Sequence, residues 1–538
     1  MPEPQHIRRG VGAIRSAVPV LLTGALLVCS APLSAQQKDR SPVFKSARPK
    51  EDLPKVYPSD PLNQIWQTFQ LSRQAAAGDM VAQYEVGVRY FLGVGVEADT
   101  VQAAFWTKKS ADQNYNPARF NMAILTYHGW GVAWNPFESF RHVQTCAEKG
   151  MPDAEYFLSF LYLEDLVVPA DYDKALSLLR KAAEAGYEPA KRFLPRVEEI
   201  RRQAAPGGQA SSSPADSSAG RTAARAGRSI PLHQTFAPVA LDFEGDSTGQ
   251  QGRGNLLRSA LESAGPEMRQ ALGLSRMLES KIQPDSSTLA AITEAADEGS
   301  PEALALLGRT YEQGIDVPRD DIRAAFYYVR AIRMDSPRAG LLLQELIRRN
   351  GFFGELKTSA SRRDAVALYV WAGLVAIGFD APMAQGGAVI TPGQALGFLQ
   401  DASALGNTQA MIELGLCYYS GRWVGRDLGK AVSLWHEAAQ GGSGEAEVRL
   451  CVAKVREGGT ELGDAVATLE RAASKGSVLA EVALGYCYET GRGAAENIST
   501  AVRLYRTGAS RGSQDAYRAL RRLHDDLRPS DREFSMPE

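Results

Sequence analysis

Residues 82–96, AQYEVGVRYFLGVGV, and residues 118–132, ARFNMAILTYHGWGV, decide how this chain folds. Both begin with alanine, carry a small residue five positions later and end in glycines, and their starts lie 36 residues apart. Self-similarity at such a fixed period is typical of repeat proteins, in which each repeat is one supersecondary unit. The same pattern returns from further leading alanines, which are Ala154, Ala190, Ala303, Ala410, Ala446, Ala480 and Ala516.

The first half of each repeat predicts an amphipathic helix. Tyr84, Val88 and Phe91 stand at helical spacing and would form one buried stripe. The small residue, Gly87 in this copy, would let a second helix approach closely. The closing glycines suit the left-handed conformation that ends a helix.

The second half of each repeat predicts another helix, which a polar residue caps. Asp or Asn at this position can accept a hydrogen bond from the first free amides of the helix. The six caps are Asp99, Asn135, Asp171, Asp320, Asp427 and Asn497. A single pair of helices cannot bury both of its faces, so neighbouring pairs must stack. The sequence therefore predicts an all-α solenoid of tandem helix-turn-helix repeats, each about 36 residues long.

This pattern resembles the Sel-one-like repeat, a family related to the tetratricopeptide repeats. The resemblance rests on small residues in the first helix, Gly-x-Gly-Val, the cap, Lys-Ala, a large aromatic residue and Ala-Ala-x-x-Gly. Residues 118–132 and residues 480–493, AEVALGYCYETGRG, are good copies of the first helix, and residues 427–442, DLGKAVSLWHEAAQGG, closely copy the second. The resemblance covers most of residues 62–202 and 254–528. It implies an adaptor that holds partners in complex assembly or signalling.

Composition changes along the chain predict its domain organisation. A polar, Pro- and Ser-rich leader and an Ala/Gly/Ser/Pro-rich linker cannot bury enough apolar surface to become ordered. The second array is less regular than the first, and residues 350–363, NGFFGELKTSASRR, are expected to lengthen one of its turns. The expected segments are a signal peptide (1–35), a flexible leader (36–61), a first array (62–203), a disordered linker (204–253), a second array (254–528) and a tail (529–538).

The first 35 residues have the order of a secretory signal peptide. Arg8, Arg9 and Arg15 precede an apolar stretch, residues 17–30, and Ser34 and Ala35 offer a cleavage site. An uncleaved membrane anchor is the alternative, although the apolar run is short for a membrane span. Lipidation at Cys29 is disfavoured, because Val28 stands where a very small residue is required. We expect an exported protein of a bacterial periplasm or cell envelope.

Charge and motif searches predict no catalytic residue, cofactor or metal. Lys and Arg total 60 against 62 Asp and Glu, a net charge of −2, which argues against nucleic acid as the main partner. There is no His-Glu-x-x-His, phosphate loop, Gly-x-Ser-x-Gly elbow or Cys-x-x-Cys pair. Most of the cysteines beyond the signal segment fall on apolar helix faces and are expected to be buried; they are Cys146, Cys417, Cys451 and Cys487.

Three tryptophans in turns are the candidate partner-binding residues. Trp134 stands where other repeats have small or charged residues, and Trp423 lies in a glycine turn. Trp130 lies in the same turn as Trp134. We expect Trp134 to be exposed and to contact a partner, since large aromatic residues often anchor interfaces. The alternative is that its ring lies on the surface of its own repeat.

The sequence favours a scaffold that binds a protein or peptide on a superhelical surface, with any envelope association made through its partners. Two alternatives stay open. The first is a hydrolase of a cell-wall component or a β-lactam, with groups that converge from distant repeats. The second is a carbohydrate-binding module that uses exposed tryptophans. Neither the partner nor the oligomeric state follows from the sequence.

Overall fold

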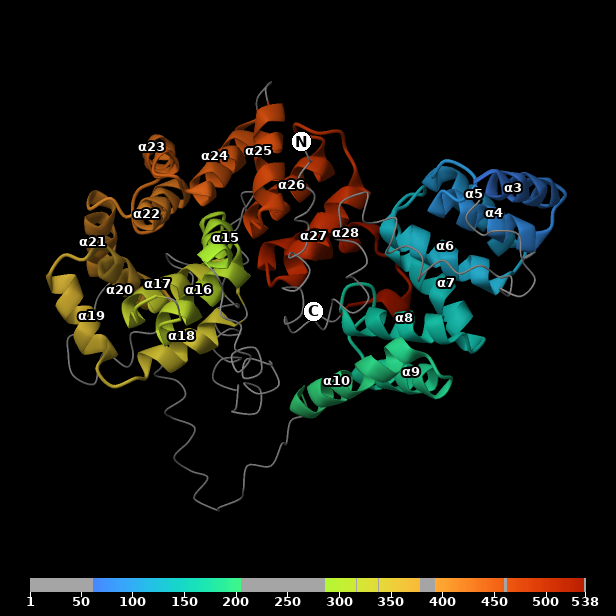
Figure 1. Ribbon diagram of the computed structural model, residues 1–538, viewed down its shortest axis with the longest axis horizontal. Helices are drawn as coiled ribbons and strands as arrows, with labels where there is room; N and C mark the ends of the chain where they lie inside the picture. Colours follow the sequence, from blue (N-terminus) through green and yellow to red (C-terminus); the bar gives the residue numbers. More distant parts are fainter. Residues whose placement is uncertain are drawn as a thin grey trace, which may run out of the picture. The chain divides into compact units, whose positions relative to one another are not determined.

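The computed structural model describes residues 61–204, 286–315, 317–336, 338–377, 392–458 and 462–536. These residues form 22 α-helices and one short 3-10 helix, with no strand among them. Figure 1 shows consecutive helices lying side by side as antiparallel pairs, which confirms the all-α solenoid. The predicted signal peptide lies outside the described residues, as do the leader and the linker except for residues 61 and 204 at their edges.

The chain divides into two compact units. Unit 1 contains the described residues 286–446, and unit 2 contains 61–204 together with 447–536. The last repeats therefore pack with the first array, although sequence order groups them with the second. The predicted array boundaries stay predictions, because residues 205–285 are not described.

The helices of unit 2 pair as the repeat predicts, with α4 against α5, α6 against α7, α8 against α9 and α26 against α27. Their bounds are α3 (Pro61–Ala76), α4 (Met80–Leu92), α5 (Thr100–Asp112), α6 (Asn116–His128), α7 (Pro136–Glu148), α8 (Pro152–Leu163), α9 (Tyr172–Glu184), α10 (Glu188–Ala204), α25 (Gly463–Ser474), α26 (Val478–Thr490), α27 (Ile498–Ser510), α28 (Gln514–Leu527) and the 3-10 helix η3 (Arg532–Phe534).

Unit 1 follows the same rule, with α16 against α17, α20 against α21 and α22 against α23. Its helices are α15 (Ser286–Asp297), α16 (Pro301–Gln313), α17 (Asp321–Arg333), α18 (Ala339–Ile347), α19 (Phe352–Ser361), α20 (Ala365–Ala376), α21 (Pro392–Ala404), α22 (Thr408–Ser420) and α23 (Leu428–Gln440). The boundary between the units falls within α24 (Gly444–Glu457).

The predicted caps and closing glycines are confirmed. The side chain of each of the six Asp or Asn caps accepts a hydrogen bond from a backbone amide in the first turn of its helix. Gly93 and Gly129 end α4 and α6 with φ of 72° and 66°, in the left-handed region. These local signals fix where each helix begins and ends.

The small residue of the first helix seats a large ring from the second. A Cβ atom added at Gly415 would overlap Trp435, and one added at Gly485 would overlap Tyr505. Both rings are buried. Glycine in the middle of these helices lowers helix propensity, but it permits the close packing that holds each pair together.

One sequence expectation in unit 1 is wrong. Residues 350–363 do not form a lengthened turn, because most of them fold into α19. Gly351 adopts a φ of 97° just before the helix. Phe352 and Leu356 are then buried one helical turn apart. No described helix is long and apolar enough to cross a membrane.

Candidate partner-binding surfaces

Trp134 is buried, with 6% of its surface exposed, so the expectation of an exposed ring is wrong. Its ring meets the ring of His524 edge to face, with the centroids 5.0 Å apart. His524 belongs to α28, nearly 400 positions further along the chain. Sequence spacing within one repeat cannot reveal so distant a neighbour. The ring that matched no packing position in its own repeat packs against another repeat of the same unit.

The other two candidate tryptophans are partly buried. Trp130 stacks on His128 with ring centroids 4.2 Å apart, and it also contacts Phe91. The Trp130 ring therefore packs on its own repeat and on the repeat before it. Trp423 has a positive φ of 64° in its turn, a conformation that non-glycine residues adopt rarely. A partner-binding role for Trp130, Trp134 and Trp423 stays a prediction.

Within unit 2, α27, α28 and η3 pack onto α6, α7 and α8 and onto the turns that follow α6 and α8. We call this contact the intramolecular interface. The hydroxyl of Ser499 donates to the carbonyl of Gly129 at 2.9 Å. Arg528 donates to the carbonyls of Leu166 and Val167 at 2.9 and 3.1 Å. Short turns of the first array are thus tied to the last two repeats.

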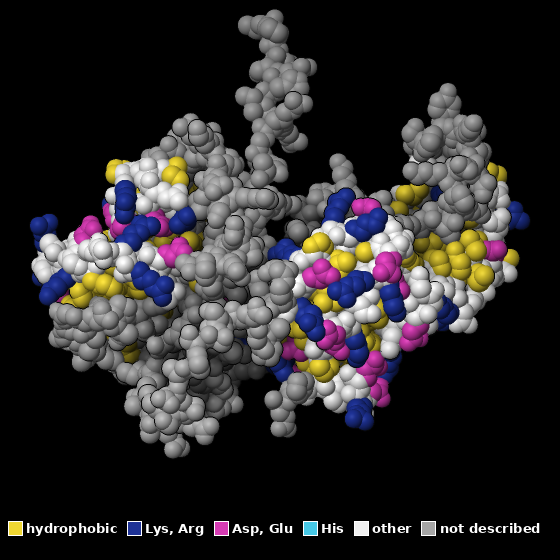
Figure 2. All heavy atoms as spheres, turned by 90° about the horizontal axis from the view of Figure 1, so that it is seen from below, with side chains coloured by type: hydrophobic (Ala, Val, Ile, Leu, Met, Phe, Trp, Pro, Cys, Tyr) yellow, Lys and Arg dark blue, Asp and Glu magenta, His cyan; other side chains and the backbone are white. Residues whose placement is uncertain are grey.

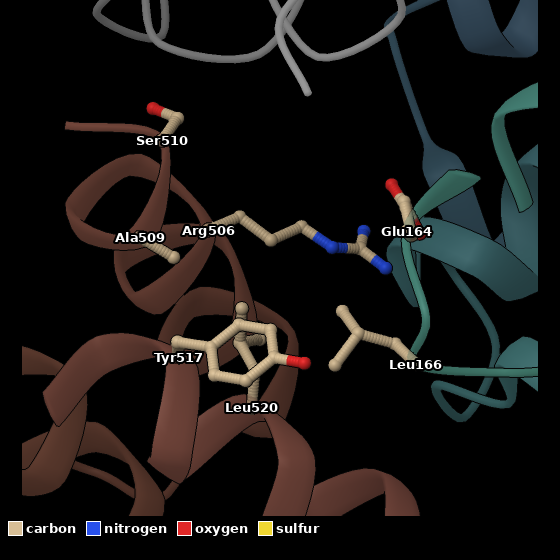
Figure 3. Close-up of a pocket in the computed structure, with 7 residues that line it drawn as sticks. All are labelled: Glu164, Leu166, Arg506, Ala509, Ser510, Tyr517 and Leu520. Carbon is tan, nitrogen blue, oxygen red and sulfur yellow. The ribbon is translucent and has the colours of Figure 1, made fainter. Parts of the chain in front are cut away.

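Arg506 of α27 is the central charge of the intramolecular interface and is buried. Its guanidinium carbon lies 3.8 Å from the centroid of the Tyr127 ring, a cation–π contact, and Nη1 donates to the Tyr127 carbonyl at 3.3 Å. The Tyr127 hydroxyl donates to the Glu164 carboxylate at 2.8 Å. Figure 3 shows the Arg506 side chain extending toward Glu164. The ring and the carboxylate together reduce the cost of burying this charge.

A small cavity lies beside this arginine (Figure 3). It measures about 10 Å³, enough for a single water molecule but not for an organic substrate. The cavity is therefore too small to be a substrate pocket. The cavity is lined by Glu164, Leu166, Arg506, Ala509, Ser510, Tyr517 and Leu520.

Burial shifts the titration of the groups around Arg506. The pKa of His128 and that of His524 are each lowered to about 3, first by burial and then by the positive charge of Arg506. Burial raises the pKa of Glu164, while Arg506 and the Tyr127 hydroxyl act in the opposite direction. Both histidines are therefore neutral at pH 7, and they behave as packing residues.

The tail after α28 folds back onto α7. Phe534 is fully buried, and its ring centroid lies 5.1 Å from that of Phe137 and 5.6 Å from that of Phe140. Arg141 forms an ion pair with Asp531. Gln144 donates to Glu533 at 3.3 Å. A short acidic segment with one aromatic anchor thus occupies one face of α7.

Large apolar side chains are exposed on α3 and α5. Trp66 is 60% exposed, Val101 61% and Phe105 48%, and Ile65 and Phe69 are exposed to a similar degree. Figure 2 shows hydrophobic side chains gathered at the end of unit 2 that carries α3, α4 and α5. Terminal repeats of a solenoid usually present a polar outer face, so this apolar end stands out as a contact surface. Motif searches missed it, although the 36-residue spacing of its residues was a signal that could have found it.

The described residues contain no group of three or more His, Cys, Asp or Glu side chains that could hold a metal ion. The four cysteines within the described residues are free thiols. Three are buried and Cys451 is partly buried, as the sequence predicts for small core residues. Burial raises the pKa of Cys146 and of Cys487 to about 11, so both thiols are protonated at neutral pH.

These features define a class of protein, the α-solenoids built from tandem helix-turn-helix repeats. The chain is a Sel1-like repeat protein. The Sel1 repeat matches residues 81–115, 116–151, 152–187, 301–336, 408–443 and 478–513. Proteins with these repeats generally act as protein-interaction scaffolds, and the fold is typically non-catalytic.

Among curated proteins, the chain is similar to an uncharacterized protein of Neisseria meningitidis serogroup B, with 30% identity over 111 residues. It is also similar to chitin synthase regulatory factor 3 of Schizosaccharomyces pombe, with 29% identity over 130 residues. These matches cover 21% and 23% of this chain. The chain spans only 23% and 14% of the two relatives, so each likeness is confined to a part of each protein.

The solved structures that are similar to this chain include two repeat proteins. One is a protective antigen of uropathogenic Escherichia coli strains displaying an SLR fold, with 20% identity over 84% of this chain and 81% of that one, and a TM-score of 0.28. The other is a Sel1 repeat protein from Oxalobacter formigenes, with 30% identity over 24% of this chain and 98% of that one, and a TM-score of 0.23. These TM-scores are too low to support an argument about the fold. The fold of this chain is established by its own helices and repeats.

Proposed function

We propose that this chain is an exported, non-catalytic scaffold that holds a protein or peptide partner in a bacterial cell envelope, where it serves envelope assembly or secretion. One observation carries the proposal. At its N-terminal end, the first array presents an apolar surface, which is formed by Ile65, Trp66 and Phe69 of α3 and by Val101 and Phe105 of α5. Large side chains exposed together at one end of a stacked solenoid favour a contact with another molecule.

The packing of unit 2 supports a binding role over a catalytic one. The cavity beside Arg506 measures about 10 Å³, so neither a β-lactam nor a cell-wall fragment fits there. The pKa values of His128 and His524 lie near 3, far below the range that suits a general base at neutral pH. The burial of Trp134 also removes one of the rings that a carbohydrate-binding role would use.

In-cell photocrosslinking tests the binding role. A photoreactive phenylalanine analogue replaces Phe105 in the full chain, and a matched chain carries it at Leu405, which is exposed to a similar degree in unit 1. We expect a discrete protein adduct from position 105 that position 405 does not give. If position 105 gives only self-adducts or lipid adducts, or if both positions give the same adducts, the scaffold role is wrong.

A reporter fusion tests export. Residues 1–61 are fused to an alkaline phosphatase that is active only outside the cytoplasm. The charged start and apolar stretch predict an active fusion. The matched fusion changes Leu21 and Leu26 to Glu and should be inactive, because charges interrupt the apolar stretch. Equal activity from both fusions, or activity from neither, would contradict export by this segment.

A further inference from the structure

The exposed apolar residues of the first array recur at one register. Ile65, Val101 and Phe137 are 36 residues apart, and so are Phe69, Phe105 and Arg141. These residues lie on α3, α5 and α7, the second helices of successive repeats. We call them the apolar ladder, with one rung on each helix: Ile65 and Phe69, Val101 and Phe105, and Phe137 and Arg141. Equivalent positions in a solenoid face the same way, so the three rungs belong to one surface.

The third rung of the apolar ladder is occupied by the chain's own tail. Phe137 is 1% exposed, and its ring packs against Phe534 of the tail as well as against His524 and Arg528. The Arg141 guanidinium pairs with Asp531 and lies 5.5 Å from the centroid of the Phe534 ring. Gln144, one turn further along α7, binds Glu533. The unit therefore already shows how this face takes a short segment: an aromatic ring enters, and acidic residues beside it meet polar and basic side chains.

The first two rungs remain exposed, and α5 carries two lysines beside its rung. On α5, Lys108 stands at the position of Gln144, 36 residues earlier. The ammonium of Lys109 lies 4.6 Å from the centroid of the Phe105 ring, which stands at the position that Arg141 occupies on α7. Lys108 pairs with Asp112, at 3.1 Å across solvent-exposed side chains, a contact that contributes little to stability. An incoming carboxylate can therefore compete for this lysine.

We propose that the exposed rungs on α3 and α5 bind a segment of a partner protein in which an aromatic residue follows closely after acidic residues. The segment binds as Asp531, Glu533 and Phe534 of the tail bind on α7. This inference rests on the proposed scaffold role and names the chemistry of the partner. The aromatic ring packs on Val101 and Phe105, and an acidic residue just before it meets Lys108.

A fluorescent peptide with the sequence of residues 529–538, PSDREFSMPE, is the probe, and its binding to the full chain is measured by anisotropy. We expect saturable binding that weakens at least tenfold for Phe105→Ser and for Lys108→Glu. A peptide with alanine in place of Phe534 should bind at least tenfold more weakly. Phe105 and Lys108 are exposed, so both variants should keep the thermal unfolding profile of the parent chain.

The matched controls are Leu405→Ser and Lys191→Glu, which change an exposed leucine and an exposed lysine away from the apolar ladder. Both should bind the peptide as the parent does. Two results would place the peptide on α7 alone and overturn the proposal. One is a peptide affinity that Phe105→Ser does not change, and the other is binding that appears only after residues 529–538 are deleted. The absence of saturable binding would also overturn it, as would binding of anionic vesicles that depends on Phe105 and excludes the peptide.

The outcomes separate this inference from the scaffold role. Protein adducts at position 105 with no binding of the acidic–aromatic peptide would leave the scaffold standing and remove the proposed partner chemistry. Peptide binding without adducts at position 105 would contradict the scaffold role and leave the proposed chemistry standing. The surface would then recognise such a segment without holding a partner in the cell.

Discussion

At the scale of single residues, unit 2 is held by side chains that sequence spacing marks as unremarkable. Arg506 lies in a second helix at a position that His436 occupies on α23, where the side chain is exposed. In α27 the same position is buried over Tyr127 and beside Glu164. The difference comes entirely from the packing of the last repeats on the first array.

His524 makes the stability of unit 2 depend on pH. Its pKa in the folded chain is about 3, against an ordinary value of 6.5, so between these values the unfolded chain binds a proton that the folded chain does not. The free energy of unfolding therefore falls as the pH drops from 6.5 toward 3, by up to about 1.4 kcal/mol per pH unit. Glu164 acts in the opposite direction, because its raised pKa favours proton uptake in the folded chain.

His524→Phe tests this by removing the titration while keeping a ring against Trp134. Urea unfolding at pH 7 and pH 5 should show a smaller loss for the variant than for the parent, by about 1–2 kcal/mol. The control His436→Phe changes an exposed histidine and should lose as much as the parent. An unchanged pH dependence in His524→Phe would contradict the burial of this histidine.

Trp134→Ala should be strongly destabilising, because the ring is buried against His524. Truncating a buried Trp costs about 3–5 kcal/mol through lost burial and the cavity left behind. Trp66→Ala is the control; its ring is mostly exposed, and the change should stay within about 0.5 kcal/mol. Equal, small effects in thermal unfolding would mean that Trp134 is exposed after all.

At the scale of helices, the sequence is most informative because the signals are local. The caps at Asp99 and Asn135 and the closing glycines at Gly93 and Gly129 act within one turn of the backbone, so a single repeat contains all the information needed to place them. The α19 helix was missed because its evidence is not local. Gly351 and the polar residues of this segment are typical of a turn, and the helix is recognised only from the burial of Phe352 and Leu356 in the folded unit.

Two helical glycines with different surroundings give a prediction at this scale. Gly485→Ala brings a Cβ atom into overlap with the edge of the Tyr505 ring and should lower the free energy of unfolding by about 1–3 kcal/mol. Gly397→Ala, in α21, meets nothing within 4 Å and should stabilise by about 0.5–1 kcal/mol through higher helix propensity. Calorimetry of both variants checks the contrast, and equal shifts would contradict the close contact of α26 with α27.

At the scale of the whole molecule, sequence order does not give the grouping of repeats. Residues 447–536 join 61–204 in one compact unit through Arg506, Arg528 and Phe534, contacts that span more than 350 residues. The repeat period predicts that repeats stack on their neighbours, but it gives no information on contacts between repeats that lie far apart in the chain. The buried Trp134 and the occupied third rung of the apolar ladder both follow from this packing, which is why the sequence predicted the repeats and missed the site.

The central claim is that the second helices of the first array take short acidic–aromatic segments, with the chain's own tail as the resident one. Hydrogen–deuterium exchange of the full chain and of a chain without residues 529–538 tests it most directly. We expect faster exchange in α7 after deletion, because the contacts of Phe534, Asp531 and Glu533 are lost, with no change in α22 and α23. Unchanged exchange in α7, or faster exchange throughout, would show that no such docking face exists.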